Sequence, residues 1–144
     1  MKHYLVDTNV IIDLLLNREG AAAAAALIDG AEQGEYKVSL CALSYTNIYY
    51  SLRKFLSHEN RINCLSQLGE VVNTLPVNGT VITTALRAGW KDFEDSVQYH
   101  CALIDGSVDG IVTRNGKDFI LSAIDVVDPA EFLKRQAGKV DYLN

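Results

Sequence analysis

The sequence predicts an α/β fold, a three-layer α/β/α sandwich in which helices cover both faces of a mainly parallel central sheet. Two observations predict it. Short apolar segments, typical of buried strands, alternate along the chain with longer helical segments, and turn residues follow the strands. The chain also has 144 residues, of which 49% are hydrophobic, and this suffices for a single domain over residues 1–144 with a core of its own.

The expected strands are short runs of apolar and β-branched residues. The first ends at the polar residues Asp7-Thr8-Asn9, and the fourth stops at Arg114-Asn115-Gly116. Pro76 weakens the third, because proline has no backbone N–H to donate to a sheet. The five strands are expected at residues 4–6, 36–40, 71–77, 110–113 and 125–127.

The expected helices follow from propensity, periodicity and end signals. Six consecutive alanines at residues 21–26 have the highest helix propensity of any residue type. Ile62, Leu65 and Leu68 recur at i, i+3 spacing, and Pro129 suits the first turn of a last helix. Helices are expected at residues 10–16, 21–34, 44–55, 80–89, 93–104 and 129–135, with a further one around 62–68.

Charge and cysteine content narrow the class of protein. Lys and Arg total 13 against 18 Asp and Glu, a net charge of −5, which argues against a protein that coats a polyanion but not against nucleic acid as a locally held substrate. Three cysteines without a C-x-x-C pair indicate reduced thiols. Because there is no signal peptide and no run of 18 apolar residues, we expect a cytoplasmic protein that does not enter a membrane.

Acidic residues follow the predicted strands at one edge of the sheet. In open parallel sheets the ligand site lies outside the carboxyl ends of the strands, which here means just after Val6, Leu40 and Val112. Three separate segments deliver acids to that edge: Asp7, then Asp92, Glu94 and Asp95, then Asp118.

Carboxylates gathered in this way raise one another's pKa unless a cation compensates their charge. Mg²⁺ or Mn²⁺ suits them, because both ions prefer oxygen ligands. Each acid also has a structural interpretation. Asp7 and Asp92 fit N-cap positions, Asp95 fits a position in the first turn after Asp92, and Asp118 fits a solvated loop. Spacing by itself leaves both interpretations open.

Three motifs resemble those of the PIN-domain ribonucleases, a family that includes the toxins of VapBC-type toxin–antitoxin pairs. They are LVDTNVIID at residues 5–13, DFEDSVQ at residues 92–98 and IVTRNGKDF at residues 111–119. The three occur in the family's order and spacing. The resemblance therefore covers most of the chain and is far more specific than any single motif.

The resemblance implies the α/β/α sandwich and an endoribonuclease activity that depends on Mg²⁺ or Mn²⁺. It also implies an RNA substrate, a homodimer and, for toxin members, a cognate antitoxin that blocks the site. By position, it implies that Asp7 and Asp95 hold the metal and that Asn115 or Asp118 takes a fourth polar position. The expected catalytic residues are Asp7, Asp95 and Asp118, and the expected metal ligands are these three and Asp92, which is an auxiliary ligand or a helix cap.

Further polar residues flank these acids. Auxiliary polar roles are expected for Asn47, Thr113 and Asn115. Basic residues that could contact phosphates are Arg53, Arg114 and Lys117, although ordinary solvated charge explains them equally well.

One departure from the family pattern concerns the helix after the second strand. The family often has Glu where this chain has Asn47, and an amide supplies no negative charge and cannot act as a general base. Asp92 is one candidate for the missing charge. A degenerate domain that binds RNA or protein without cutting stays an alternative. Phosphoryl transfer through Asp7 as nucleophile is weaker, because the second Asp usual in such enzymes is replaced by Asn9.

Overall fold

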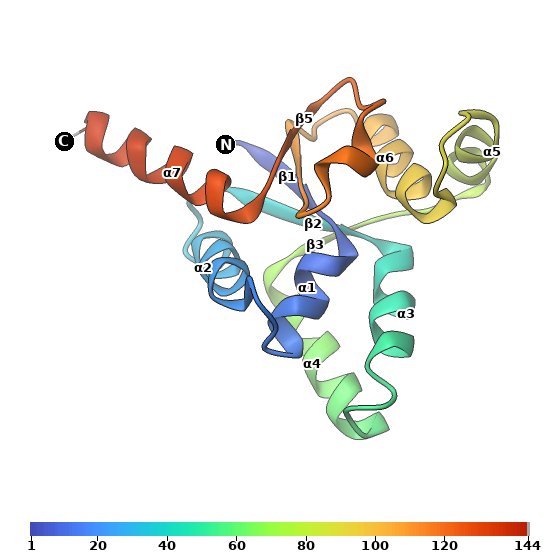
Figure 1. Cartoon of the computed structure of the whole chain (residues 1–144), viewed down its shortest axis with the longest axis horizontal. Coiled ribbons are helices and arrows are strands. Elements are labelled where there is room, and N and C mark those ends of the chain that lie inside the picture. Colours follow the sequence, from blue (N-terminus) through green and yellow to red (C-terminus); the bar gives the residue numbers. More distant parts are fainter. Residues whose placement is uncertain (144) are drawn as a thin grey trace.

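In the computed structural model, which describes residues 1–143 and the side chains of residues 1–139, five strands form one sheet (Figure 1). They are β1 (His3–Val6), β2 (Lys37–Cys41), β3 (Asn73–Leu75), β4 (Gly110–Val112) and β5 (Asp125–Val127). Every neighbouring pair is parallel, in the order β3-β2-β1-β4-β5. The chain adds β2 and β3 on one side of β1 and then crosses to add β4 and β5 on the other. The strand order therefore reverses between β1 and β4, where ligands bind in sheets of this kind.

Within residues 1–143, seven α-helices and one 3₁₀ helix connect and follow the strands. They are α1 (Thr8–Leu15), α2 (Ala21–Glu32), α3 (Ala42–Ser51), α4 (His58–Val71), α5 (Gly79–Arg87), α6 (Phe93–Asp105), η1 (Gly116–Phe119) and α7 (Pro129–Leu143). Helices α1, α2, α3, α4 and α7 pack on one face of the sheet, and α5 and α6 pack on the other (Figure 1). Among residues 1–143, no helix has both the length and the apolar character that crossing a membrane requires.

The central strand β1 supplies both cores. Tyr4 and Val6 belong to the core under α1 and α2, whereas Leu5 belongs to the core under α5 and α6. Successive side chains of a strand point to opposite faces, so a strand covered on both sides must be apolar throughout. This explains the continuous apolar run that precedes Asp7.

The predicted fold class is confirmed, and the differences concern the ends of elements. The third strand covers only Asn73–Leu75: it begins late because α4 continues through Val71 and has Val72 as its C-cap, and it ends before Pro76. The helix expected at residues 44–55 is α3, which begins at Ala42 and ends at Ser51. The last helix continues beyond its predicted end at residue 135 through Leu143.

Three aromatic rings, here called the aromatic cluster, attach α7 to the sheet. Phe132 of α7 meets Tyr4 and Tyr36 edge to face, with ring centroids 4.8 and 4.9 Å apart. Gly30 of α2 lies against Tyr36 so closely that a Cβ at this position would overlap the phenol. A glycine is required here by the close approach of the ring, not by its backbone conformation.

His3 predicts how stability depends on pH. Its ring is buried, with Nε2 2.6 Å from Ser39 Oγ and Nδ1 3.0 Å from Ser107 Oγ. Burial, and next the charge of Lys37, lower the pKa of His3 below its usual 6.5. The unfolded chain therefore takes up a proton before the folded protein does, so the stability is complete above about pH 6.5 and is lost as the pH falls below it.

Protonation of His3 in the unfolded chain is expected to contribute a decrease in the free energy of unfolding between pH 6.5 and 5.5, of at most about 1.4 kcal/mol per pH unit. Urea denaturation at several pH values measures this slope. Measured relative to the wild type, the free energy of unfolding of His3→Gln should rise as the pH falls from 6.5 to 5.5, whereas that of His58→Gln, at an exposed position, should not. Equal slopes in wild type and His3→Gln would contradict this role of His3.

Candidate functional site

Asp7 lies at the centre of the candidate site, between the carboxyl ends of β1 and β4. Its backbone N–H donates to the carbonyl of Val112, 2.9 Å away, which continues the β1–β4 pairing by one residue. Its side chain is 2% exposed. Oδ1 accepts a hydrogen bond from Gln98 Nε2 at 3.0 Å, and Oδ2 accepts one from the Thr113 hydroxyl at 2.8 Å. Asp7 occupies the N-cap position of α1, yet helix α6 and the end of β4 hold its carboxylate.

Gln98 is a site residue that the sequence analysis did not single out. Its Oε1 accepts from the backbone N–H of Thr8 at 3.2 Å, while its amide donates to Asp7. The Thr8 hydroxyl donates to Ser44 Oγ at 2.7 Å, which connects α1 to α3. The sequence held a signal for Gln98: residues three and four apart share one face of a helix, so Gln98 lies on the same face as Glu94 and Asp95.

The start of α6 brings three acids to the site. Asp92 is the N-cap, and its Oδ1 accepts from the backbone N–H of Asp95 at 2.9 Å. The capping interpretation of Asp92 is therefore confirmed. Negative side chains in the first turn of a helix also interact favourably with the partial positive charge there. Glu94 and Asp95 both lie in that first turn.

The charges of four other acids act on Asp95. Burial and the charges of neighbouring acids raise the pKa of Asp95 to about 7. Those neighbours, in decreasing order of effect, are Asp7, Asp92, Asp118 and Glu94. They come from all three segments that the sequence predicted at this edge.

The pKa values of Asp7 and Glu94 shift in the same direction. Burial raises the pKa of Asp7 above its usual value, and the hydrogen bonds from Gln98 and Thr113 act against that rise. Burial also raises the pKa of Glu94, with smaller contributions from the charges of Asp7 and Asp92. In the absence of a cation, the folded site therefore disfavours full ionisation of its carboxylates.

The Asp95→Asn variant is expected to be more stable than the wild type when no metal is present. The pKa of Asp95 is higher in the folded than in the unfolded protein, so ionisation destabilises the fold increasingly as the pH rises from about 4 to 7. At pH 8 in EDTA we expect a gain of about 1–2 kcal/mol, an estimate reduced for screening by solvent, and no gain at pH 4. Urea denaturation measures both values.

An exposed acid provides the control for this prediction. Asp29→Asn on α2 should change the free energy of unfolding by less than about 0.5 kcal/mol at either pH. A loss of stability in Asp95→Asn at pH 8 would contradict the proposed crowding of negative charge around Asp95.

Asn47 of α3 lies beside Glu94 of α6. A hydrogen bond from the Asn47 side chain lowers the pKa of Glu94, in opposition to the effect of burial. The position where the family often has Glu thus holds an amide that contacts a carboxylate from another helix. Glu94, together with Asp92, is therefore a candidate source of the negative charge that Asn47 does not supply.

The segment after β4 supplies the remaining predicted polar groups. Thr113 is buried, donates to Asp7, and accepts from the backbone N–H of Asn115 at 3.0 Å. Asp118 is exposed on η1, where its backbone N–H donates to the carbonyl of Asn115 at 2.9 Å. Its charge acts on Asp95, so the structure brings Asp118 to the same group of acids.

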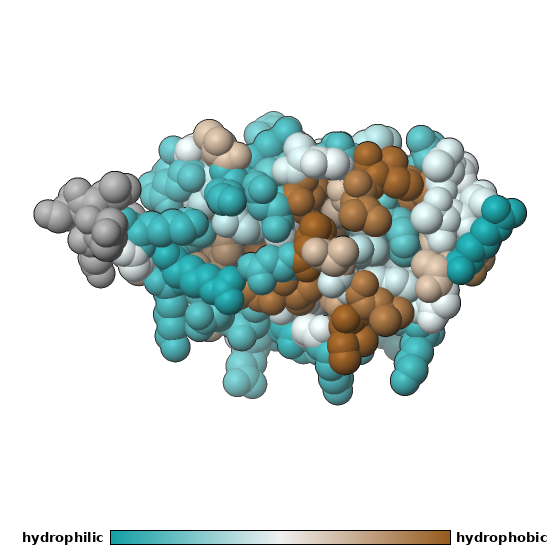
Figure 2. Space-filling view, turned by 90° about the horizontal axis from the view of Figure 1, so that it is seen from above, coloured by the Kyte–Doolittle hydropathy of each residue, from teal (hydrophilic) through white to brown (hydrophobic). Residues whose placement is uncertain are grey.

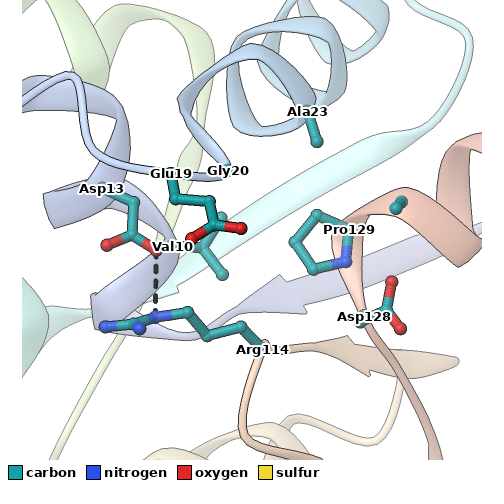
Figure 3. A pocket seen from close by; sticks show the side chains of 9 residues that line it. Val10, Asp13, Glu19, Gly20, Ala23, Arg114, Asp128 and Pro129 are labelled. Carbon is teal, nitrogen blue, oxygen red and sulfur yellow. Dashed lines mark ion pairs between the residues drawn. The ribbon is translucent and has the colours of Figure 1, made fainter.

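The side chain of Arg114, in the segment after β4, extends toward α1. Its Nε lies 2.9 Å from Oδ2 of Asp13, a buried acid of α1 (Figure 3). The pair lines a cavity together with Glu19 and Asp128. Arg114 thus anchors the segment after β4 to α1, and its proposed contact with a phosphate stays a prediction.

The other two basic candidates differ in position. Arg53 follows the end of α3, where its guanidinium lies 3.7 Å from the centre of the Tyr50 ring and Nη1 donates to the Tyr50 carbonyl. Lys117 is exposed on η1, next to Asp118. Lys117 is thus adjacent in sequence to one of the acids that act on Asp95. These acids and Asp95 are here called the acid group, which consists of Asp7, Asp92, Glu94, Asp95 and Asp118.

The donors at this edge suit a divalent cation in their chemistry. Asp7, Asp92, Asp95 and Asp118 offer carboxylate oxygens, which Mg²⁺ and Mn²⁺ prefer, and a positive charge would relieve the repulsion felt by Asp95. Each carboxylate has about four lone-pair positions, so Asp7 retains acceptor capacity beside its two hydrogen bonds. Over residues 1–139, no group of three or more His, Cys, Asp and Glu side chains is arranged to hold a metal ion.

Comparisons with known proteins identify similar chains. Residues 3–117 match the family model of the PIN domain. A toxin–antitoxin complex from Klebsiella pneumoniae contains a chain with a TM-score of 0.65 at 20% identity, covering 88% of this chain and 97% of that one. VapBC-1 from nontypeable Haemophilus influenzae gives 0.67 at 18% identity, covering 89% and 98%. VapBC2 from Rickettsia felis, bound to a promoter DNA fragment, gives 0.63 at 13% identity, covering 88% and 97%. No curated protein matches the sequence.

Proposed function

The chain belongs to the PIN-domain family, and from this premise we propose that it is an endoribonuclease, dependent on Mg²⁺ or Mn²⁺, that serves as the toxin of a toxin–antitoxin pair. One observation carries the proposal: burial and the charges of acids from three separate segments, the buried Asp7 among them, raise the pKa of Asp95 to about 7. The toxin role is supported by the likeness to chains from toxin–antitoxin complexes. In this proposal the protein works in the cytoplasm as a homodimer, and a cognate antitoxin inhibits it.

The proposal assigns the cation to Asp7, Asp92, Asp95 and Asp118. When bound, the ion supplies Lewis-acid chemistry, which favours ionisation of water and offsets the negative charge of the phosphodiester. Gln98 and Thr113 orient the Asp7 carboxylate by their hydrogen bonds. Asp95, whose pKa lies near 7 without a cation, releases its proton as positive charge arrives.

Thermal unfolding with and without Mn²⁺ tests the proposed cation. Metal at about 100 times its dissociation constant should stabilise the wild type by roughly 2.7 kcal/mol. Because Asp95→Asn is itself expected to change the stability, only the increment caused by Mn²⁺ is compared between proteins. The increment should be present in the wild type and in Asp29→Asn, and lost in Asp7→Asn and Asp95→Asn. An equal increment in all four proteins would place the metal elsewhere.

Asn47 favours a second candidate function, a PIN domain that binds RNA or protein without cutting. It removes one negative charge from a position where the family often has one. This alternative expects no increment from Mn²⁺ and no cleavage of RNA by the purified protein. Phosphoryl transfer through Asp7 is less suitable, because that side chain is buried and both its oxygens accept hydrogen bonds.

A further inference from the structure

A second cavity, of about 460 Å³, adjoins the acid group. It lies between the loop that precedes α6 and the segment formed by η1 and the two residues after it. Asp92 and Asp118 line it, and both act on the pKa of Asp95. A molecule bound at the acids can therefore extend directly into this cavity.

The aromatic wall of the cavity is held by the protein core. Trp90 is half-buried, and its ring stacks on Tyr99 with centroids 4.8 Å apart and meets Phe119 edge to face at 5.7 Å. Trp90 also lines the cavity. The indole is thus anchored by the core before any ligand arrives, which lowers the entropic cost of binding one.

Two apolar side chains complete this wall. Ile120 is 82% exposed and Leu121 is 59% exposed, and both line the cavity. Figure 2 looks onto the upper side of Figure 1, where η1 and the segment leading to β5 lie, and shows apolar side chains gathered in the middle of that side. Apolar side chains exposed beside a cavity indicate a surface that a ligand covers.

Two lysines flank the apolar wall. Lys91 precedes Asp92, and Lys117 precedes Asp118, and both lysines are exposed and line the cavity. An aromatic ring with apolar neighbours suits a nucleobase, and ammonium groups beside it suit phosphates of the backbone. The cavity volume lies within the range of about 300–1,000 Å³ that is usual for sites of small ligands.

We infer that this cavity is a subsite for one nucleotide of single-stranded RNA, adjacent to the phosphate that is cleaved. Trp90, Ile120 and Leu121 contact the base, and Lys91 and Lys117 contact the backbone phosphates. This inference rests on the proposed function for the position of the cleaved phosphate. RNA is favoured over a protein segment because the cavity shares Asp92 and Asp118 with the acids that the cleavage chemistry uses and carries a lysine next to each.

The protein contains one tryptophan, so its tryptophan fluorescence comes from Trp90, which lines this cavity. Hexaadenylate and hexauridylate RNA are titrated against the wild type, in EDTA and again in Ca²⁺, and the quenching of Trp90 is followed. Saturable quenching by at least one of the two RNAs is expected. The variants Ile120→Ser and Leu121→Ser should each bind roughly fivefold more weakly, because each removes an apolar contact. Lys117→Ala should weaken binding and reduce the dependence of log K on log salt by about 0.7.

Matched variants on other surfaces serve as controls. Phe55→Ser replaces another highly exposed apolar residue, and Lys134→Ala replaces an exposed lysine on α7, so both should bind as the wild type does. Absence of quenching by both RNAs in both buffers, or equal affinities for Leu121→Ser and Phe55→Ser, would overturn the subsite. In either case the exposed apolar pair would be assigned to a protein partner.

Cleavage assays separate this inference from the proposed function. If the wild type cuts no RNA, but RNA quenches Trp90 and binds Leu121→Ser more weakly, the subsite is supported and the nuclease activity is rejected. If the wild type, Leu121→Ser and Lys117→Ala all cut RNA in Mn²⁺ with the same KM, the nuclease activity is supported and the subsite is rejected.

Discussion

RNA cleavage by Asp7→Asn is expected to fall by about 100-fold or more below the wild-type rate in Mn²⁺, equal to about 2.7 kcal/mol of lost transition-state stabilisation. Asparagine keeps the size of the side chain, and its oxygen can still accept from Gln98 while its amide group donates to the Thr113 hydroxyl. It lacks the negative charge with which Asp7 would hold a cation. Asp95→Asn is expected to show a loss of the same size, because Asp95 lies among the same acids.

Initial rates of cleavage of labelled RNA, measured for each variant and for the wild type as reference, give this effect. Circular dichroism and thermal unfolding establish that each variant is folded. Asp29→Asn, which removes an exposed acid from α2, should cut as fast as the wild type and excludes a general effect of net charge. Asp95→Asn cutting RNA at the wild-type rate in Mn²⁺ would show that the assignment of the site is wrong.

The Phe132→Ala variant is expected to lose about 3–5 kcal/mol of stability. Phe132 is 1% exposed and completes the aromatic cluster with Tyr4 and Tyr36. Its removal leaves a cavity between α7 and the sheet, in addition to the loss of buried apolar area and of two edge-to-face contacts. Because a domain of this size is stable by only about 5–15 kcal/mol, the loss is a large fraction of the total.

Urea denaturation at neutral pH measures this loss, and Phe55→Ala is the matched control. Phe55 is 61% exposed, so the same substitution there should change the free energy of unfolding by less than about 0.5 kcal/mol. Similar values for the two variants would show that α7 does not pack on the sheet through Phe132.

The sequence predicted the architecture because its signals are local. Alternation of short apolar runs with helical periodicity indicates a parallel sheet with helices on both faces, and the turn after each strand follows from its own residues. The ends of elements were less predictable. Val71 is compatible with a strand by composition, yet α4 includes it, because tertiary packing decides such positions.

The sequence also placed acids from three segments at one edge, since the carboxyl ends of parallel strands meet there. The sequence did not predict which residues each acid contacts. Asp7 accepts from Gln98 and Thr113, which are 91 and 106 positions away, and Arg114 pairs with the buried Asp13 of α1.

By itself, therefore, the sequence determined the fold class, the edge that carries the acids and the family resemblance. Only the tertiary structure decided that Gln98 holds Asp7, that Asn47 lies beside Glu94, and that Trp90 lines a cavity next to Asp92. The physical reason is the range of the interactions. Helix and strand patterns arise between residues a few positions apart, whereas these contacts depend on strand order and on how α3 and α6 pack, which the free energy of the whole chain sets.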